Sequence, residues 1–263
     1  MVNLGNDEIV KYPFLAEAGK YLSDKGFSLD QFGTDPDLKK IVDNAFERII
    51  TASEGKIFKS DPTSNNSVLP LEIFSFLIAV IMLKLSGMNT LIRRFSLAEA
   101  RRAEKFLEKD LMNHQDATKA KLSLQILQEL FSVTVEKIDD EFTILASDYL
   151  KHSINFHERE WKLINRKVVN GKVHLTPHET VRLVRKELDR HIYTKINSSS
   201  SPEMIIGFET YVDKLKQLAK KFEVKTVESK EFPPCIKHAI EVLEKGENLP
   251  HSGRFMLATF LLN

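Results

Sequence analysis

Apolar residues recur at helical spacing through the first half of the chain. Between residues 35 and 55 they lie three and four positions apart and so share one helix face: Leu38, Ile41, Val42, Ala45, Phe46, Ile49 and Ile50. Asp35-Pro36 suits the start of this helix, and Gly55 suits its end. Similar patterns predict helices over residues 69–85, 89–108 and 117–131. We therefore expect a helical body over residues 1–132.

The segment 69–85 is apolar on all sides. Pro70, Glu72 and Lys84 interrupt it, so its apolar part is shorter than the roughly 20 residues that a membrane-spanning helix needs. A helix of this kind in a soluble chain is the central helix of a bundle. We predict a buried helix and no association with a membrane.

The pattern changes near Val133 to short stretches of β-rich sequence. Asn170-Gly171 lies between two such stretches, and this pair favours a two-residue type I′ turn, in which both residues have positive φ. Thr176-Pro177 then suits the start of another helix. Residues 133–197 are thus predicted to form a small α/β subdomain, a hairpin plus a helix.

The last part of the chain returns to helical periodicity. Residues 198–223 carry an amphipathic helix that we assign to the helical body, 224–232 form a charged linker, and 233–263 form a partial helical segment. Since 31 residues are few to bury a core, we expect this segment to be ordered only if it docks elsewhere. The predicted fold class is mainly α.

Charge and composition narrow the functional classes. The formal net charge is +1, so a nucleic-acid site would have to be a local patch, not a field over the whole molecule. One cysteine excludes an intramolecular disulfide, and the first residues have neither a basic leader nor an apolar stretch. These features predict a cytoplasmic protein.

The helix 89–108 carries a row of cations: Arg93, Arg94, Arg101, Arg102 and Lys105. They could follow a phosphate backbone, but pairing within the helix is favoured because Glu99 lies three residues before Arg102. The acidic groups 35–37 and 139–141 suit a helix start and a turn better than a metal site. We predict no catalytic residue in this chain.

Cys235, Asn248, His251 and Arg254 are the candidate functional residues of the last segment. A lone cysteine is ordinarily a small apolar residue, since one thiolate cannot hold an iron–sulfur cluster. An arginine beside a histidine can donate several hydrogen bonds to phosphate oxygens, although a surface helix end explains the same pair.

Five segments, in this order, resemble the large, non-catalytic subunit of archaeal and eukaryotic-type heterodimeric DNA primase. They are Tyr12-Pro13-Phe14-Leu15, the run 93–102, Asp148-Tyr149-Leu150-Lys151, the run from Trp161 to Arg166, and the C-terminal piece with Cys235, Asn248, His251 and Arg254. The resemblance implies a subunit that binds the catalytic small subunit and supports RNA primer synthesis in DNA replication.

The same resemblance implies roles for the last segment. In the family a [4Fe-4S] cluster is held by four cysteines, of which only Cys235 is present, so we expect a chain truncated within its iron–sulfur domain and without a bound cluster. His251 and Arg254, with Asn248 beside them, are implied to contact template DNA and the RNA primer or initiating nucleotide. A nucleoid-associated location follows from this role.

An aromatic and aliphatic group in the α/β subdomain is the candidate partner surface: Tyr149, Leu150, Ile154, Phe156 and Trp161. Such residues are enriched at the centres of protein interfaces. They would equally cover the inner face of the hairpin, and both interpretations stay open. The alternative for the whole chain is a helical adaptor without a replication role.

Overall fold

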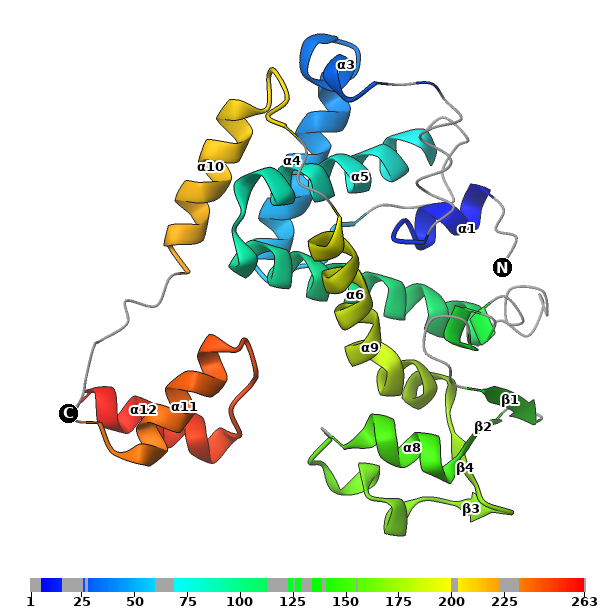
Figure 1. The fold of residues 1–263 in the computed structure, drawn as a ribbon. Coiled ribbons are helices and arrows are strands. Elements are labelled where there is room, and N and C mark those ends of the chain that lie inside the picture. Colours follow the sequence, from blue (N-terminus) through cyan, green and yellow to red (C-terminus); the bar gives the residue numbers. More distant parts are fainter. Residues whose placement is uncertain are drawn as a thin grey trace. The chain divides into compact units, whose positions relative to one another are not determined.

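The structure is a computed structural model. It describes residues 6–15, 26, 28–59, 69–112, 123–124, 126–128, 134–138, 141–154, 156–199, 203–222 and 232–262. The chain divides into two compact units, Met1–Ala219 and Lys220–Asn263 (Figure 1). The predicted helix 117–131 and the predicted linker 224–232 lie largely outside the described residues.

The first unit contains the helical body. Its helices are α1 (Asn6–Lys11), α3 (Leu29–Thr34), α4 (Lys39–Ser53), α5 (Leu69–Ser86), α6 (Asn89–Leu111), α9 (Pro177–Ser198) and α10 (Glu209–Lys220). α5 packs against α1, α4 and α9, and α6 packs against α4 and α9 (Figure 1). This arrangement confirms a mainly α fold.

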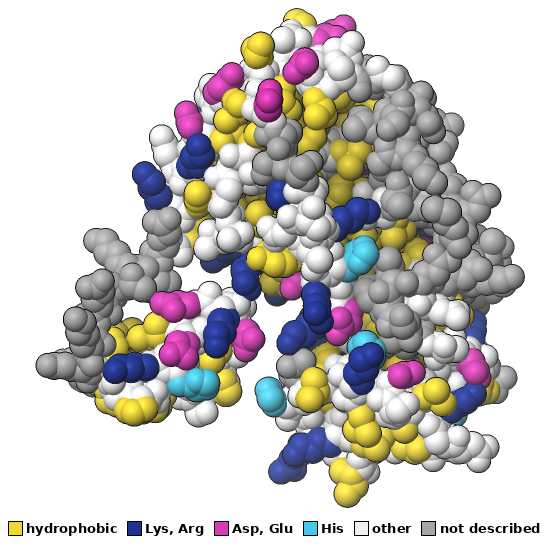
Figure 2. Space-filling model, in the orientation of Figure 1, with side chains coloured by type: hydrophobic (Ala, Val, Ile, Leu, Met, Phe, Trp, Pro, Cys, Tyr) yellow, Lys and Arg dark blue, Asp and Glu magenta, His cyan; other side chains and the backbone are white. Residues whose placement is uncertain are grey.

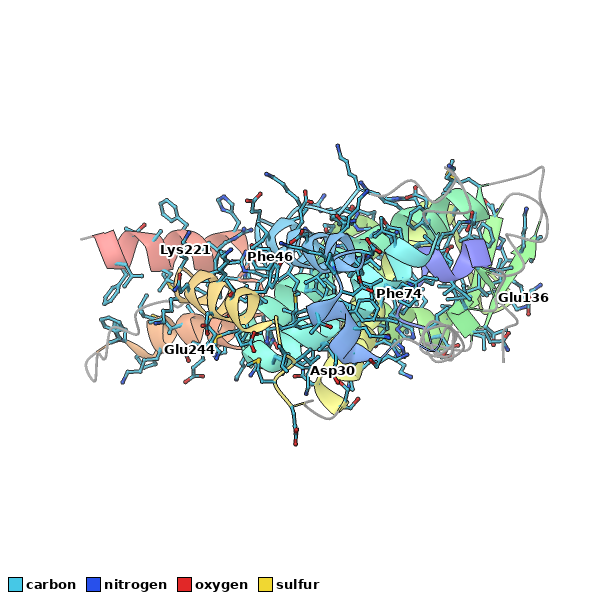
Figure 3. All side chains as sticks on the ribbon, turned by 90° about the horizontal axis from the view of Figure 1, so that it is seen from above. Asp30, Phe46, Phe74, Glu136, Lys221 and Glu244 are labelled. Carbon is cyan, nitrogen blue, oxygen red and sulfur yellow. The ribbon has the colours of Figure 1, made fainter. Side chains whose placement is uncertain are left out.

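α5 is the buried helix that its all-round apolar sequence predicts. Ile73, Ile78, Met82 and Leu83 are completely buried along it. Phe74, labelled in Figure 3, is buried and packs edge-on against Phe32 of α3, with 5.7 Å between ring centroids. In the described part of the chain, no helix is both long enough and apolar enough to cross a membrane.

The predicted helix after Pro36 begins later than its sequence indicates. Residues 36–38 form a turn, in which Asp35 Oδ1 accepts a hydrogen bond from the backbone N–H of Asp37 at 2.9 Å, and α4 starts at Lys39. Gly55, with φ of 76°, lies just after the end of α4 as expected. The acidic pair 35–37 is therefore part of a turn.

The α/β subdomain is built on a four-stranded antiparallel sheet. Its strands are β1 (Val135–Ile138), β2 (Glu141–Leu145), β3 (Val168–Val169) and β4 (Lys172–Leu175), in the spatial order β1-β2-β4-β3. α8 (Ala146–Ser153) and two short 3₁₀ turns, Arg159–Trp161 and Leu163–Asn165, complete it. Asn170 and Gly171 have φ of 49° and 74°, which confirms the predicted hairpin turn.

α9 joins this subdomain to the helical body. Thr176 caps its first turn, since the Thr176 hydroxyl accepts from the Glu179 backbone N–H at 3.2 Å while the Glu179 carboxylate accepts from the Thr176 N–H at 2.9 Å. The helix then contacts β2 and β4 at one end and α6 along its length. One continuous element therefore fixes the sheet to the body.

The second unit is a helix pair, α11 (Pro234–Glu244) and α12 (His251–Leu262). It buries a small apolar cluster of Ile236, Ala239, Leu249 and Leu257. Phe232 and Phe260 close one side with an edge-to-face contact of 5.1 Å between centroids. The segment 233–263 thus has a small core of its own, whereas we expected it to depend on docking elsewhere.

Candidate functional site

A buried network of charges connects α4, α5 and α6. Arg48 donates two hydrogen bonds to the Glu99 carboxylate, at 2.6 and 2.7 Å, and its Nη1 lies 3.5 Å from Glu72 Oε2. Arg102 Nη2 lies 3.7 Å from the same Glu72 oxygen. All four side chains are buried. The predicted attraction between Glu99 and Arg102 within α6 is present, since each charge shifts the pKa of the other, but the hydrogen bonds of Glu99 come from Arg48 of another helix.

The network shifts the pKa of its members. Burial alone would raise the pKa of Glu99, but the charge and hydrogen bonds of Arg48 outweigh it and hold that pKa below its usual range. Burial, together with repulsion from Arg48, lowers the pKa of Arg102 to about 10. Both groups are therefore charged at neutral pH.

The other arginines of α6 also have structural partners. Arg94 donates to the Ser53 carbonyl at 2.9 Å and Arg101 lies 3.5 Å from the Gly55 carbonyl, so both cover the C-terminal end of α4. The guanidinium of Arg93 lies 5.2 Å from the ring centroid of Tyr193. These contacts disfavour the row of cations as a track along a duplex backbone.

The aromatic group of the α/β subdomain is held together by hydrogen bonds and stacking. The Tyr149 hydroxyl donates to the Trp161 carbonyl at 2.7 Å and accepts from Arg166 Nε at 3.0 Å. Phe156 stacks on Trp161 at 4.2 Å, and the Arg166 guanidinium lies 4.9 Å from the Trp161 centroid. Tyr149 and Trp161 are buried in this arrangement, which gives them a structural role within the subdomain.

Leu150 and Ile154 differ from their neighbours because they face outward. They lie four residues apart at the end of α8 and are 50% and 75% exposed. Further exposed apolar side chains occur on the same subdomain, namely Ile138, Leu145, Ile164, Val168 and Val169, and Figure 2 shows hydrophobic groups on its surface. Sequence reasoning missed Ile164, which is 90% exposed, although its run of β-rich sequence was recognised.

The four candidate residues of the second unit are all exposed. His251 is the first residue of α12, and Arg254 follows one turn later, so the two side chains leave the helix on neighbouring positions. Asn248 precedes the helix in the connecting loop. Cys235 borders an apolar groove of about 770 Å³ that Phe255, Met256 and Phe260 also line.

These residues do not by themselves make a cluster site. A [4Fe-4S] cluster takes four cysteine thiolates, and this chain contributes one. Within the described ranges, no three histidine, cysteine, aspartate or glutamate side chains gather closely enough to hold a metal ion.

Comparisons with known proteins agree with this organisation in two parts. Residues 86–204 match the family model of the eukaryotic and archaeal DNA primase large subunit N-terminal domain, and residues 225–263 match that of its C-terminal domain. The first match contains α6, the sheet and α9; the second contains α11 and α12.

Curated relatives of this chain are named DNA primase large subunit PriL. The chain is 31% identical to the DNA primase large subunit PriL of Methanococcoides burtonii over 270 residues, which cover 99% of this chain and 73% of the relative. It is 30% identical to that of Methanosarcina acetivorans, over 98% of this chain and 69% of the relative. This chain belongs to the eukaryotic and archaeal DNA primase large subunit family.

Proposed function

We propose that this chain is the non-catalytic subunit of a heterodimeric primase. It binds the catalytic small subunit, stabilises it and supports synthesis of RNA primers for DNA replication. The observation that carries the proposal is the match to both domain models of the family together with near-complete coverage of the chain by relatives named DNA primase large subunit. The match favours this role over that of an adaptor without a replication function.

The contribution of the chain to primer synthesis is positioning. Holding a reacting group in place can lower a barrier by several kcal/mol, on the order of 7–11 in the best intramolecular cases, without any bond being made by the holder. The helical body is suited to this role because it is stiff. Glu72 and Glu99 pair with buried arginines and so join three of its helices. In this proposal the metal-binding carboxylates for nucleotidyl transfer belong to the small subunit.

The exposed end of α8 is the proposed contact with the small subunit. Leu150 and Ile154 lie on one face, and apolar side chains at the centre of an interface lose water on binding. Tyr149, Phe156 and Trp161 support this face from within through their stacking and hydrogen bonds. Tyr149 and Trp161 are buried and Phe156 is half-buried, so these side chains support the surface from beneath it.

The second unit is the proposed nucleic-acid module. Arg254 and His251 are exposed on α12, where a guanidinium fork and an imidazole can donate to the phosphates of template, primer or initiating nucleotide, with Asn248 nearby. We further propose that Cys235 is one ligand of a [4Fe-4S] cluster whose other ligands lie outside these 263 residues. The intracellular, nucleoid-associated location is part of the same proposal.

Co-expression with an archaeal primase small subunit tests the central claim. We expect a one-to-one complex on gel filtration at micromolar concentration. A Leu150→Arg, Ile154→Arg variant should elute separately from the small subunit, whereas Met204→Arg, a control at an exposed position of the helical body, should remain bound. Separate elution of the unaltered chain would refute the subunit role, and a complex unaffected by the double change would refute the interface.

A further inference from the structure

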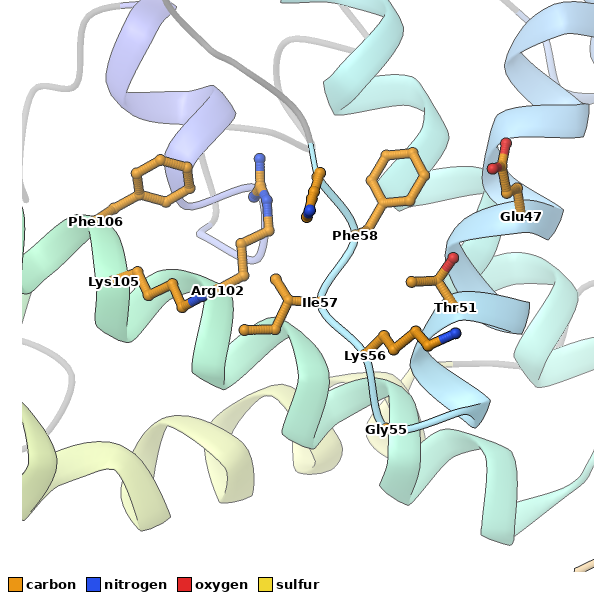
Figure 4. Close-up of a pocket in the computed structure, with 10 residues that line it drawn as sticks. Glu47, Thr51, Gly55, Lys56, Ile57, Phe58, Arg102, Lys105 and Phe106 are labelled. Atoms are coloured by element: carbon orange, nitrogen blue, oxygen red, sulfur yellow. The ribbon is translucent and has the colours of Figure 1, made fainter.

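A pocket in the helical body combines cations with aromatic rings. It measures about 780 Å³ and lies between α4, the segment 55–59 that follows it, and α6 (Figure 4). Its lining includes Lys56, Lys59, Lys105, Phe58 and Phe106. Figure 4 shows Ile57 directed toward the α6 side chains Arg102 and Lys105, and Phe58 directed toward α4. The volume lies within the range of about 300–1,000 Å³ typical of small-molecule sites.

The segment that forms the middle of this pocket is fixed to its two helices. The Gly55 N–H donates to the Ala52 carbonyl at 2.9 Å and the Lys56 N–H donates to the Thr51 carbonyl at 3.1 Å. From α6, Arg94 donates to the Ser53 carbonyl and Arg101 reaches that of Gly55. The start of the segment is therefore positioned against α4 and α6 before any ligand arrives, which lowers the entropic cost of binding.

The charge of the lining is predominantly positive. Lys59 and Lys105 have no ion-pair partner in the part of the chain that the structure describes. Lys56 pairs with Glu54 at 2.7 Å, and Glu47 is the carboxylate that lines the pocket. Two lysines at the edge of one hollow attract an anion, and no ion pair among the described residues has to break when it binds.

The rings in the pocket are held by buried arginines. Arg48 lies 5.4 Å from the centroid of Phe58, and Arg102 lies 5.0 Å from that of Phe106. Both rings remain partly exposed. Cations that follow a phosphate chain, combined with fixed aromatic surface, are the combination that holds single strands without reading their sequence.

We propose that this pocket binds a phosphate-bearing nucleobase, with Lys59 and Lys105 on the phosphate and Phe58 and Phe106 against the base. Such a group comes either from a free nucleoside triphosphate or from one nucleotide of a single strand. The site is separate from His251 and Arg254, which belong to the other unit, and it requires no contact with a small subunit.

Two probes distinguish the sources of the ligand: a fluorescein-labelled 15-residue thymidine strand and a fluorescent ATP, each titrated by anisotropy. The Lys59→Glu, Lys105→Glu variant should bind the relevant probe at least about ten-fold more weakly. For the strand, its log–log salt slope should fall by about 1.4, since each single-strand phosphate contact contributes about 0.7. Loss of strand binding assigns a strand, and loss of ATP binding alone assigns a free nucleotide.

A matched control and a second variant keep the test decisive. Lys137→Glu, Lys151→Glu makes the same change of charge at exposed positions of the α/β subdomain and should bind as the unaltered chain does. Phe106→Leu keeps an apolar side chain but removes the ring, and should weaken binding about five-fold, because base stacking is lost.

The titrations are repeated in a His251→Ala, Arg254→Ala chain, so that the second unit does not mask the pocket. Equal binding by the pocket double variant and its control, with both probes and in both backgrounds, would overturn the proposal. That result would leave complex formation with a small subunit unaffected, so the two proposals fail separately.

Discussion

At the scale of single residues, the local sequence shows that charges occur in the core but not which of them pair. Arg48 lies in the apolar stripe of α4, and Glu72 interrupts the apolar sequence of α5. A charged residue in an apolar stripe is itself a sign of a buried pair, because an unpaired buried charge is too costly to keep. The sequence contains this signal, but it does not identify the partner, since Arg48 and Glu99 are 51 positions apart.

Glu99→Gln tests the weight of this pair. The change removes the two charged hydrogen bonds of buried Arg48 and leaves it with the longer contact to Glu72 at 3.5 Å, so we expect a loss of about 3 kcal/mol in the free energy of unfolding. Urea denaturation at pH 7 measures it. Glu54→Gln removes the exposed pair with Lys56 and should cost at most about 1 kcal/mol. Equal losses in the two variants would show that the core network does not hold the helices.

The lowered pKa of Glu99 also predicts how stability depends on pH. Its folded-state pKa lies below the unfolded value of about 4.3, so the contribution of Glu99 is fully present above that value and disappears as the pH falls through the lower, folded pKa. Urea denaturation between pH 6 and pH 2 should show a smaller acid loss for Glu99→Gln than for the unaltered chain. Parallel curves would contradict the assignment.

At the scale of elements, features that depend on adjacent residues could be predicted from the sequence, whereas contacts between distant segments could not. The Asn170-Gly171 turn and the Thr176 cap each depend on residues that are close in sequence, and the structure confirms both predictions. α3 was not predicted, and neither was the contact of Gly33 with the residues before α10. That contact involves backbone atoms more than 170 positions apart, and no pattern within either segment points to the other.

Gly33→Ala tests this contact between elements. A Cβ on Gly33 would overlap the carbonyl oxygen of Ile206, so α3 and the turn before α10 would have to move apart. We expect a loss of about 1–3 kcal/mol, as for other overpacked sites. Gly253→Ala, in α12, meets only ordinary contacts from 3.6 Å and should be neutral or stabilising. Thermal melting followed by circular dichroism compares the two; an unchanged melting temperature for Gly33→Ala would refute the contact.

The cap of α9 allows a finer test at the same scale. Thr176→Ala removes the hydroxyl that accepts from Glu179 N–H, and a lost cap costs about 1 kcal/mol. Thr176→Ser keeps the hydroxyl and should retain most of the stability. If the two variants unfold at the same urea concentration, the hydroxyl does not cap the helix that carries the sheet.

At the scale of the whole molecule, the fold class could be predicted from periodicity, and the family from short segments in order. The exposure of single side chains could not be predicted. Tyr149 and Leu150 are adjacent in sequence and both are largely apolar, yet Tyr149 is buried and Leu150 is half-exposed. Which of them faces outward depends on the packing of α8 against α9, and this packing is set by residues distant in sequence. An interface predicted from composition therefore includes both the exposed residues of the surface and the buried residues that support it.

The two compact units are expected to fold and function separately, and a shortened chain tests this. The first unit contains the charge network and the proposed contact with the small subunit, while the second has its own cluster around Ile236 and Leu257. A chain ending at Phe222 should therefore melt within about 4 °C of the full chain, a shift that corresponds to about 1 kcal/mol at this size. It should still bind the small subunit while losing the nucleic-acid contacts of His251 and Arg254. A shortened chain that no longer binds the small subunit, although it melts as expected, would place the partner surface in the second unit.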